Sequence, residues 1–156
     1  MRNMRRKDRE MSKEFALALA DKCAYAVMAT VSPDGSPYCV PLSFAREGEW
    51  LYFHCAKEGH KIDNLKHRNK VCVSCVGDMN ILSEEYSVIY ESAVIFGTAH
   101  EVTDRDEMVR ALATICQRYV SENMKEFDDK VKSDIGRTGV WKIHIDEISG
   151  KERPKT

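Results

Sequence analysis

Runs of apolar residues, either continuous or alternating with polar ones, predict that most of this chain is β-structure. Such runs indicate strands when they are short and bounded by turn-forming residues. In the last run, Trp141, Ile143 and Ile145 alternate with polar residues, which is typical of a strand with one buried face. The predicted strands cover residues 24–31, 38–44, 50–56, 70–77, 86–102 and 139–148.

Short turns join several of these runs and predict antiparallel pairing. Residues 32–37 contain Pro33 and the Asp34-Gly35 pair, which favour a tight reversal and therefore a β-hairpin. Pro41 has no N–H to donate, so its strand is expected to lie at an edge, at a bulge or beside a ligand. Gly97, inside the longest run, predicts a bulge or bend.

Apolar residues three and four positions apart predict helices over residues 10–21, 59–68 and 104–119. Ser12 is suited to cap the first helix. Thr103 and Asp106 are suited to form a capping box at the start of the third.

This order of elements predicts an α+β, mainly β fold. We expect a six-stranded antiparallel sheet closed into a barrel, with helices at its rim. The length of 156 residues suits one domain. That domain is expected to span residues 1–156, with an N-terminal arm over 1–9 and a C-terminal tail over 150–156.

Composition and charge exclude several classes of function. The 24 Lys and Arg residues are balanced by 25 Asp and Glu residues, so a nucleic-acid partner is not expected. No apolar run approaches the ~18 residues of a membrane span, and no apolar segment of a secretory signal follows the basic N-terminus. The six cysteines are therefore expected to be reduced thiols in a cytoplasmic protein.

Positive charge gathers between residues 56 and 70, where five Lys or Arg residues and two acids give a net charge near +3. This segment leaves a strand, passes Gly59 and enters a helix. Helix amides, with Lys57 and Lys61 nearby, are suited to hold a phosphate dianion. The alternative is a basic helix face in contact with solvent.

Three other positions allow both a structural and a functional interpretation. His54 is either a packing residue or a group beside a bound cofactor or substrate, where an imidazole exchanges protons near neutral pH. Trp141 is either a core residue or part of one wall of a pocket for a flat ring. Glu91 interrupts an apolar strand, so its charge must reach solvent, a partner chain or a ligand. The same strand presents a face that is either core or one wall of a pocket for a flat ring: Val88, Tyr90, Ser92, Val94 and Phe96.

The C-x-x-C sequence from Cys72 to Cys75 lies in a predicted strand, where a separation of three places the two thiols on opposite faces. We therefore expect buried thiols there rather than a redox pair. No second pair of metal ligands accompanies them, so no metal site is expected.

Four segments, taken in order, resemble the FMN-binding proteins related to pyridoxamine 5′-phosphate oxidase, and specifically the branch linked to nitroimidazole resistance. These segments are residues 4–10, 34–44, 51–61 and 90–97. The resemblance implies a split β-barrel that forms homodimers and binds FMN at their interface.

The resemblance also implies roles for individual residues. Val40, Pro41 and Leu42 would offer backbone hydrogen bonds to the edge of the isoalloxazine ring. Ser92 and Trp141 would approach from the partner chain or the ring side. The ribityl-phosphate would be surrounded by His54, Ala56, Lys57, Gly59, His60 and Lys61.

Two positions depart from the pattern of this family. His60 stands where arginine is common, so phosphate affinity is expected to be lower and to depend on pH. Glu91 stands where a basic or small residue is common, and an acid near a phosphate would weaken binding.

The expected function is that of an FMN-dependent oxidoreductase that takes electrons from NAD(P)H and reduces a small oxidant such as a nitroaromatic. His54, near flavin and substrate, is the candidate catalytic residue. The flavin would carry the redox chemistry, so no covalent nucleophile is required. The alternatives are a non-catalytic flavin carrier or sensor, a haem-binding relative and a structural dimer without cofactor.

Overall fold

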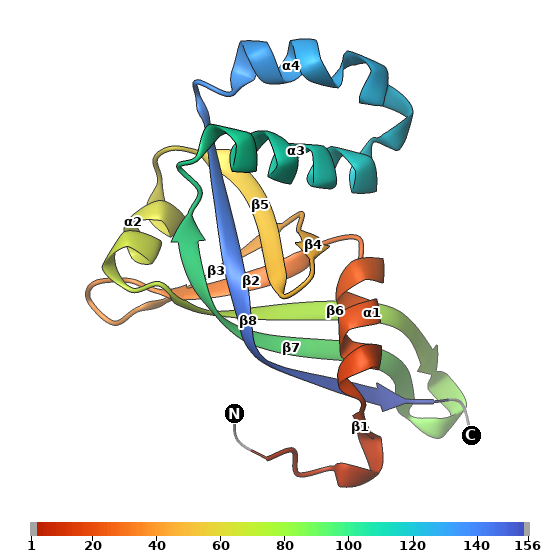
Figure 1. Ribbon diagram of the computed structural model, residues 1–156. Coiled ribbons are helices and arrows are strands. Elements are labelled where there is room, and N and C mark those ends of the chain that lie inside the picture. Colours follow the sequence, from red (N-terminus) through yellow and green to blue (C-terminus); the bar gives the residue numbers. More distant parts are fainter. Residues whose placement is uncertain (1–2, 155–156) are drawn as a thin grey trace.

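The computed structural model describes residues 3–154; the outermost residues of the expected arm and tail, 1–2 and 155–156, lie outside this range. Its centre is one antiparallel sheet of eight strands in the order β3-β2-β6-β7-β8-β5-β4, with β1 paired to β8 (Figure 1). The strands are β1 (Glu10–Met11), β2 (Ala26–Val31), β3 (Pro37–Leu42), β4 (Ala45–Glu47), β5 (Trp50–Ala56), β6 (Lys70–Leu82), β7 (Ser87–Glu101) and β8 (Thr138–Arg153).

In the described part of the chain, four α-helices and three short 3-10 helices lie around the sheet. In Figure 1, α1 crosses the long strands at one end and α2 lies at the other, while α3 and α4 lie together beyond β5. None of the helices within residues 3–154 is long and apolar enough to cross a bilayer. The helices are α1 (Lys13–Lys22), α2 (His60–His67), α3 (Arg105–Tyr119), α4 (Phe127–Asp134), η1 (Lys7–Arg9), η2 (Ser83–Glu85) and η3 (Ser121–Glu126).

The mainly antiparallel fold confirms the prediction, but the strand number and the closure differ. Eight strands are present instead of six, because β1 and β4 are only two and three residues long and leave no periodic pattern. The sheet is not closed: β3 and β4 form its two edges and do not pair within residues 3–154. Pro37 and Pro41 lie in β3 and lack N–H groups, which is typical of an edge strand.

Several boundaries also differ from those predicted. β8 continues to Arg153, so most of the expected tail is strand paired with β1 and β7. Asp104, not Thr103, caps α3: its carboxylate accepts a hydrogen bond from the Glu107 amide at 2.8 Å. Ser12 caps α1 as predicted, accepting from the Phe15 amide at 3.2 Å.

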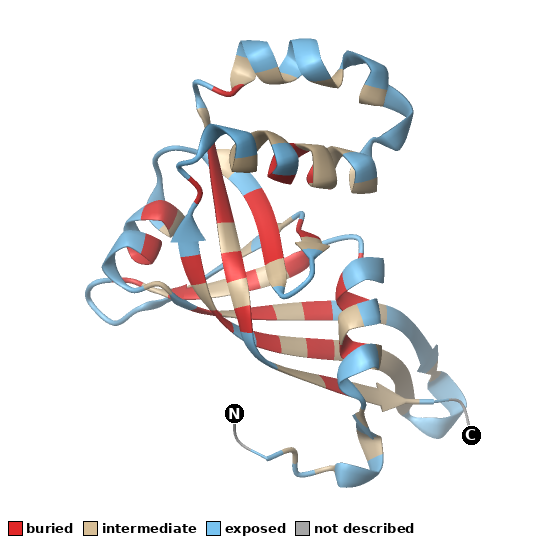
Figure 2. Cartoon of the chain, in the orientation of Figure 1, coloured by how far each residue is buried: buried red, intermediate tan, exposed pale blue. Residues whose placement is uncertain are grey.

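The core has two parts, separated by β5 and β8 (Figure 2). The larger part lies inside the curved sheet and includes Phe53, Ile95 and Ile143, each fully buried. The smaller part lies between the sheet and α3 and includes Tyr52 and Leu112. Because alternate residues of a strand point to opposite faces, β5 contributes to both parts.

Gly97 marks the predicted bulge. The register of β7 against β8 shifts between Phe96 and Gly97. A Cβ atom at Gly97 would lie 2.4 Å from the His144 carbonyl oxygen, so only glycine fits this close approach of the two backbones.

Arg118 fastens α3 to the rest of the fold. Its guanidinium donates hydrogen bonds to the carbonyls of Phe44 at 2.7 Å, Ala20 at 3.0 Å and Cys23 at 2.6 Å. Charge-assisted bonds of this kind are stronger than neutral ones. They fix α3 over the end of α1 and therefore hold α3 in place beside β5.

Candidate functional site

The basic segment of the sequence forms a corner between β5 and α2. Gly59 precedes α2 with φ 126°, a backbone conformation that favours glycine. Its carbonyl accepts from the amides of Ile62 at 2.8 Å and Asp63 at 3.1 Å. Within the described chain the amides of His60 and Lys61 have no partner, so they can donate to an anion.

Two lysines of this corner carry charge that no carboxylate neutralises. Elsewhere, Lys22 and Lys142 pair with carboxylates at 2.6 and 2.7 Å. Lys57 and Lys61 form no such pair with any residue between 3 and 154. Burial raises the pKa of the Cys55 thiol and the charge of Lys61 opposes that rise, which places Lys61 close to the end of β5. We call Lys57, Gly59, His60 and Lys61 the basic corner.

Helix α2 is fixed to the β2–β3 hairpin. The His60 imidazole lies 2.8 Å from the Ser32 hydroxyl and packs against the Tyr38 ring, with 4.1 Å between the ring centroids. Asn64 is fully buried and donates to the Thr30 hydroxyl at 2.9 Å. These contacts hold the basic corner close to β3. Nε2 of His60 is thus engaged with Ser32, while the His60 backbone amide stays available to a ligand.

The predicted ring-edge residues lie on β3. Val40 and Leu42 pack partly against the larger core, while Pro41 is exposed on the other face. Among the described strands β3 pairs only with β2, so the outer side of its backbone is available for hydrogen bonds to a ligand.

One face of the sheet is largely apolar and is left uncovered by the helices. Val76, Met79, Ile81 and Phe96 lie on it with 59%, 63%, 63% and 42% of their surface exposed. The strand register places these residues on the same side. We call this surface the open sheet face; it comprises Val27, Ala29, Cys72, Ser74, Val76, Met79, Ile81, Val88, Tyr90, Ser92, Val94 and Phe96.

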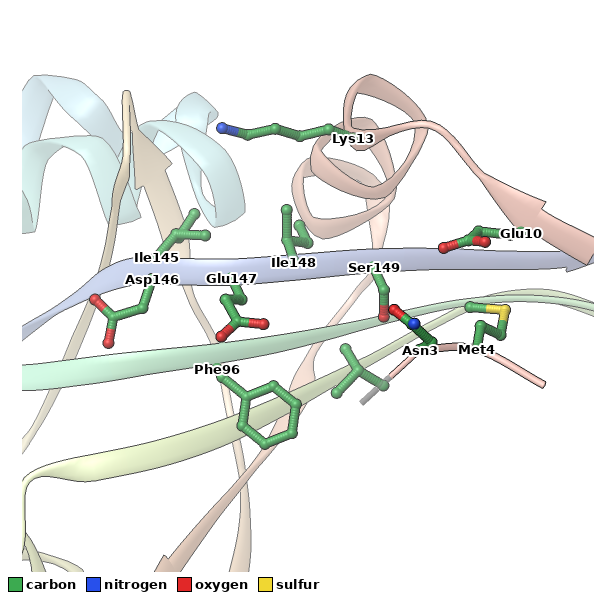
Figure 3. A pocket seen from close by; sticks show the side chains of 11 residues that line it. Asn3, Met4, Glu10, Lys13, Phe96, Ile145, Asp146, Glu147, Ile148 and Ser149 are labelled. Carbon is green, nitrogen blue, oxygen red and sulfur yellow. The ribbon is translucent and has the colours of Figure 1, made fainter. Parts of the chain in front are cut away.

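One face of β7, predicted to be either core or one wall of a pocket, is part of this open sheet face. A groove of about 680 Å³ runs over it, lined by Val94 and Phe96 together with residues 145–149 of β8. Figure 3 shows Asn3 and Met4 of the N-terminal arm beside this groove. The face is thus a wall rather than core, and the arm lies along it.

His54 faces a second hollow, between the sheet and helices α3 and α4. This cavity has a volume of about 390 Å³. The His54 side chain lines it together with Thr138 at the start of β8, and no described residue forms a hydrogen bond with its imidazole. Partial burial lowers the pKa of His54, because the charged form loses contact with water.

Three other singled-out residues are not part of the basic corner. Trp141 is 4% exposed and belongs to the larger core. Ser92 lies on the open sheet face. Six residues of extended strand, about 20 Å, separate it from Thr98, and Thr98 pairs with Lys70 just after α2. Glu91 accepts from Lys22 at 3.2 Å, so its charge is engaged within the chain.

A family model for pyridoxamine 5′-phosphate oxidase matches residues 12–152. The chain belongs to this family. A search of curated proteins found no match.

Solved structures include several with the same fold. A Bacteroides thetaiotaomicron protein, provisionally described as a 5-nitroimidazole antibiotic resistance protein, is 26% identical, with a TM-score of 0.78 over 92% of this chain and 86% of that one. An FAD and haem binding protein from Mycobacterium smegmatis is 25% identical, with a TM-score of 0.82 over 94% and 74%. A conserved protein of Mycobacterium tuberculosis, 16% identical, has a TM-score of 0.83 over 99% and 96% and shows the fold alone.

Sequence reasoning missed the cavity beside His54, because no element was predicted between residues 120 and 138. That segment forms η3 and α4. The signal was present: Phe127, Val131 and Ile135 recur every four residues, as on one face of a helix. The many charged residues between them obscured it.

We expect the His54 imidazole to titrate below the usual value of about 6.5. Its folded-state pKa is lowered, so the unfolded chain binds a proton more readily. The contribution of neutral His54 to stability is therefore complete above that value and is lost as the pH falls below it. NMR titration of the imidazole signals, assigned with a His54→Gln variant, measures this pKa. A value at or above 6.5 would contradict the burial of His54 against the cavity.

Proposed function

We propose that this protein binds FMN as a homodimer and uses it to transfer electrons from NAD(P)H to a small organic oxidant, of which nitroaromatics are the leading candidates. The observation that carries the proposal is the basic corner: two unneutralised lysines and two free amides at the start of α2. This donor set suits a phosphate dianion, the terminal group of FMN.

The residues of the chain would bind and orient this cofactor. The basic corner would hold the phosphate, and the outer backbone of Val40, Pro41 and Leu42 would hydrogen-bond the ring edge. Ala56 is the last residue of β5 and lies in the chain between His54 and Lys57 of the basic corner. Bound FMN supplies the electron transfer itself. His54, whose pKa is lowered by partial loss of contact with water, would exchange a proton with the substrate through its imidazole.

The open sheet face supports a dimer with the cofactor between the two copies. Exposed apolar patches of this kind mark protein interfaces. Ser92 lies six residues of extended strand, about 20 Å, from Thr98, which pairs with Lys70 just after α2 of the same chain. It would therefore approach the cofactor bound at the partner's corner. Trp141 is buried in the core, so it would not contact the cofactor and would instead support the strands that position the site.

The similarity to a resistance protein at 26% identity supports nitroaromatic reduction, and the flavin- and haem-binding neighbour supports two alternatives. A flavin carrier or sensor would bind FMN without turnover. A haem-binding relative would use a free histidine as axial ligand, and His54 has no hydrogen-bond partner in the described chain.

Purified protein is expected to show flavin absorption bands that NADH or NADPH bleaches without oxygen and that a nitroaromatic restores. Protein that binds FMN but is inert to both reductants would leave only the carrier. A Soret band after haem reconstitution, without FMN binding, would favour the haem relative. Protein that binds neither would overturn the proposal.

Replacing Lys61 with alanine is expected to weaken FMN binding by about 1–3 kcal/mol, roughly 5–150-fold, because a charge-assisted contact with the phosphate is lost. Fluorescence-quenching titration of the flavin measures the affinity. Lys66→Ala, an exposed position on the same helix, is the matched control and should leave affinity unchanged. Equal affinities of wild type and Lys61→Ala would remove the phosphate role of the corner.

Placing a charge on the open sheet face should separate the dimer. Phe96→Glu is expected to yield monomers in analytical ultracentrifugation, since an unpaired carboxylate would be buried in the interface. Val109→Glu, at a half-buried position of α3, is the control and should remain dimeric. A wild-type protein that is monomeric at all concentrations would contradict the interface.

A further inference from the structure

The cavity beside His54 has the size and lining of a ligand site. Its volume of about 390 Å³ lies at the lower end of the range for small-molecule pockets. Leu112 and Cys116 of α3 form one wall, and Phe127, Val131 and Ile135 of α4 and the segment after it form the opposite wall. Such a space accepts a small molecule that enters between the two helices.

The charges around the cavity favour an uncharged ligand. Lys130 and Asp134 both line it; Asp134 forms ion pairs with Lys130 at 3.5 Å and with Arg137 at 2.6 Å. Glu126 and Asn123 lie in η3 and are exposed to water. His54 is exposed at the end of β5, and its partial loss of contact with water lowers its pKa, which favours the neutral form. With Arg137 counted, the two acids and two bases at this cavity, Glu126, Asp134, Lys130 and Arg137, sum to no net charge.

The chemistry of the walls favours a flat aromatic molecule. Phe127 supplies a ring for stacking. Met124 and Cys116 supply sulfur atoms, and the thioether of methionine makes favourable contacts with ring edges. His54 supplies one hydrogen-bonding group at the strand end of the cavity.

We propose that this cavity binds a small, uncharged aromatic molecule whose single polar group hydrogen-bonds the His54 imidazole. His54 lies three residues before Lys57, so the cavity and the basic corner flank the same end of β5. The role of this molecule as the oxidant rests on the proposed function; its binding does not. The cavity is therefore tested in flavin-free protein.

The probe is N-phenyl-1-naphthylamine, a neutral dye that fluoresces in apolar surroundings. Flavin-free wild type is expected to bind it, and Val131→Phe, which fills the cavity, should weaken binding at least tenfold. Val109→Phe is the matched control, because Val109 lies on α3 outside the cavity lining and should bind as wild type does. Equal binding by folded Val131→Phe and Val109→Phe would overturn the proposal.

The hydrogen bond to His54 is tested with two ligands of similar shape. In displacement of the dye, 1-naphthol should bind about fivefold more tightly than 1-methylnaphthalene, the gain typical of one neutral hydrogen bond. His54→Phe should abolish this preference while retaining affinity for 1-methylnaphthalene. An unchanged preference would remove His54 from the site.

Cysteine labelling on the wild-type chain locates the ligand independently of any variant. Cys116 lines the cavity, whereas Cys39 is exposed on β3 and serves as the internal control. Saturating 1-naphthol should slow the reaction of Cys116 with N-ethylmaleimide, followed by mass spectrometry, and leave that of Cys39 unchanged. Equal rates at Cys116 with and without ligand would contradict binding there.

The outcomes of these measurements distinguish failure of the cavity proposal from failure of the proposed function. Loss of dye binding in a protein that still takes up FMN would overturn the cavity alone. Dye binding in a protein that never binds FMN would overturn the flavin proposal alone. Displacement of the dye by FMN would assign the cavity to the flavin and overturn this inference.

Discussion

The attachment of α2 to the end of β2 is the constraint on which the candidate site depends. Asn64 has no exposed surface and donates to the Thr30 hydroxyl, and one turn earlier His60 contacts Ser32 and Tyr38. The Asn64 side-chain oxygen accepts no hydrogen bond within the described chain. A buried amide group without a hydrogen bond costs free energy. Moving α2 away from β2 would break the one hydrogen bond that the Asn64 side chain makes, so this bond fixes the position of the helix. That position brings the basic corner to the edge strand β3.

The sequence predicted those parts of the fold that depend on local pattern. Strands with regular alternation, the hairpin at Asp34-Gly35 and the bulge at Gly97 were all visible, because side-chain periodicity and turn chemistry act over a few residues. β1 and β4 were missed because pairing with a distant strand, not local preference, makes such short segments extended. Failure of the sheet to close is also a tertiary property that no local run records.

For the candidate site, too, the sequence predicted the residues that follow a local pattern but not their partners in space. The concentration of charge around Lys57 and Lys61 appears in the sequence, but their lack of carboxylate partners appears only in three dimensions. The face that carries Phe96 allowed two interpretations, since exposed and buried apolar strands share one pattern. His54 could not be connected to a cavity, because the opposite wall is formed by residues more than 50 positions later, such as Met124 and Phe127.

The open sheet face has a consequence for how the protein behaves on dilution. If cofactor contacts come from both copies, separation of the copies removes part of every site, and flavin loss follows by mass action. The protein would then keep its flavin in concentrated solution and release it when diluted. In the proposed dimer, the apolar face that joins the copies would thus also make the number of loaded sites depend on the amount of protein present.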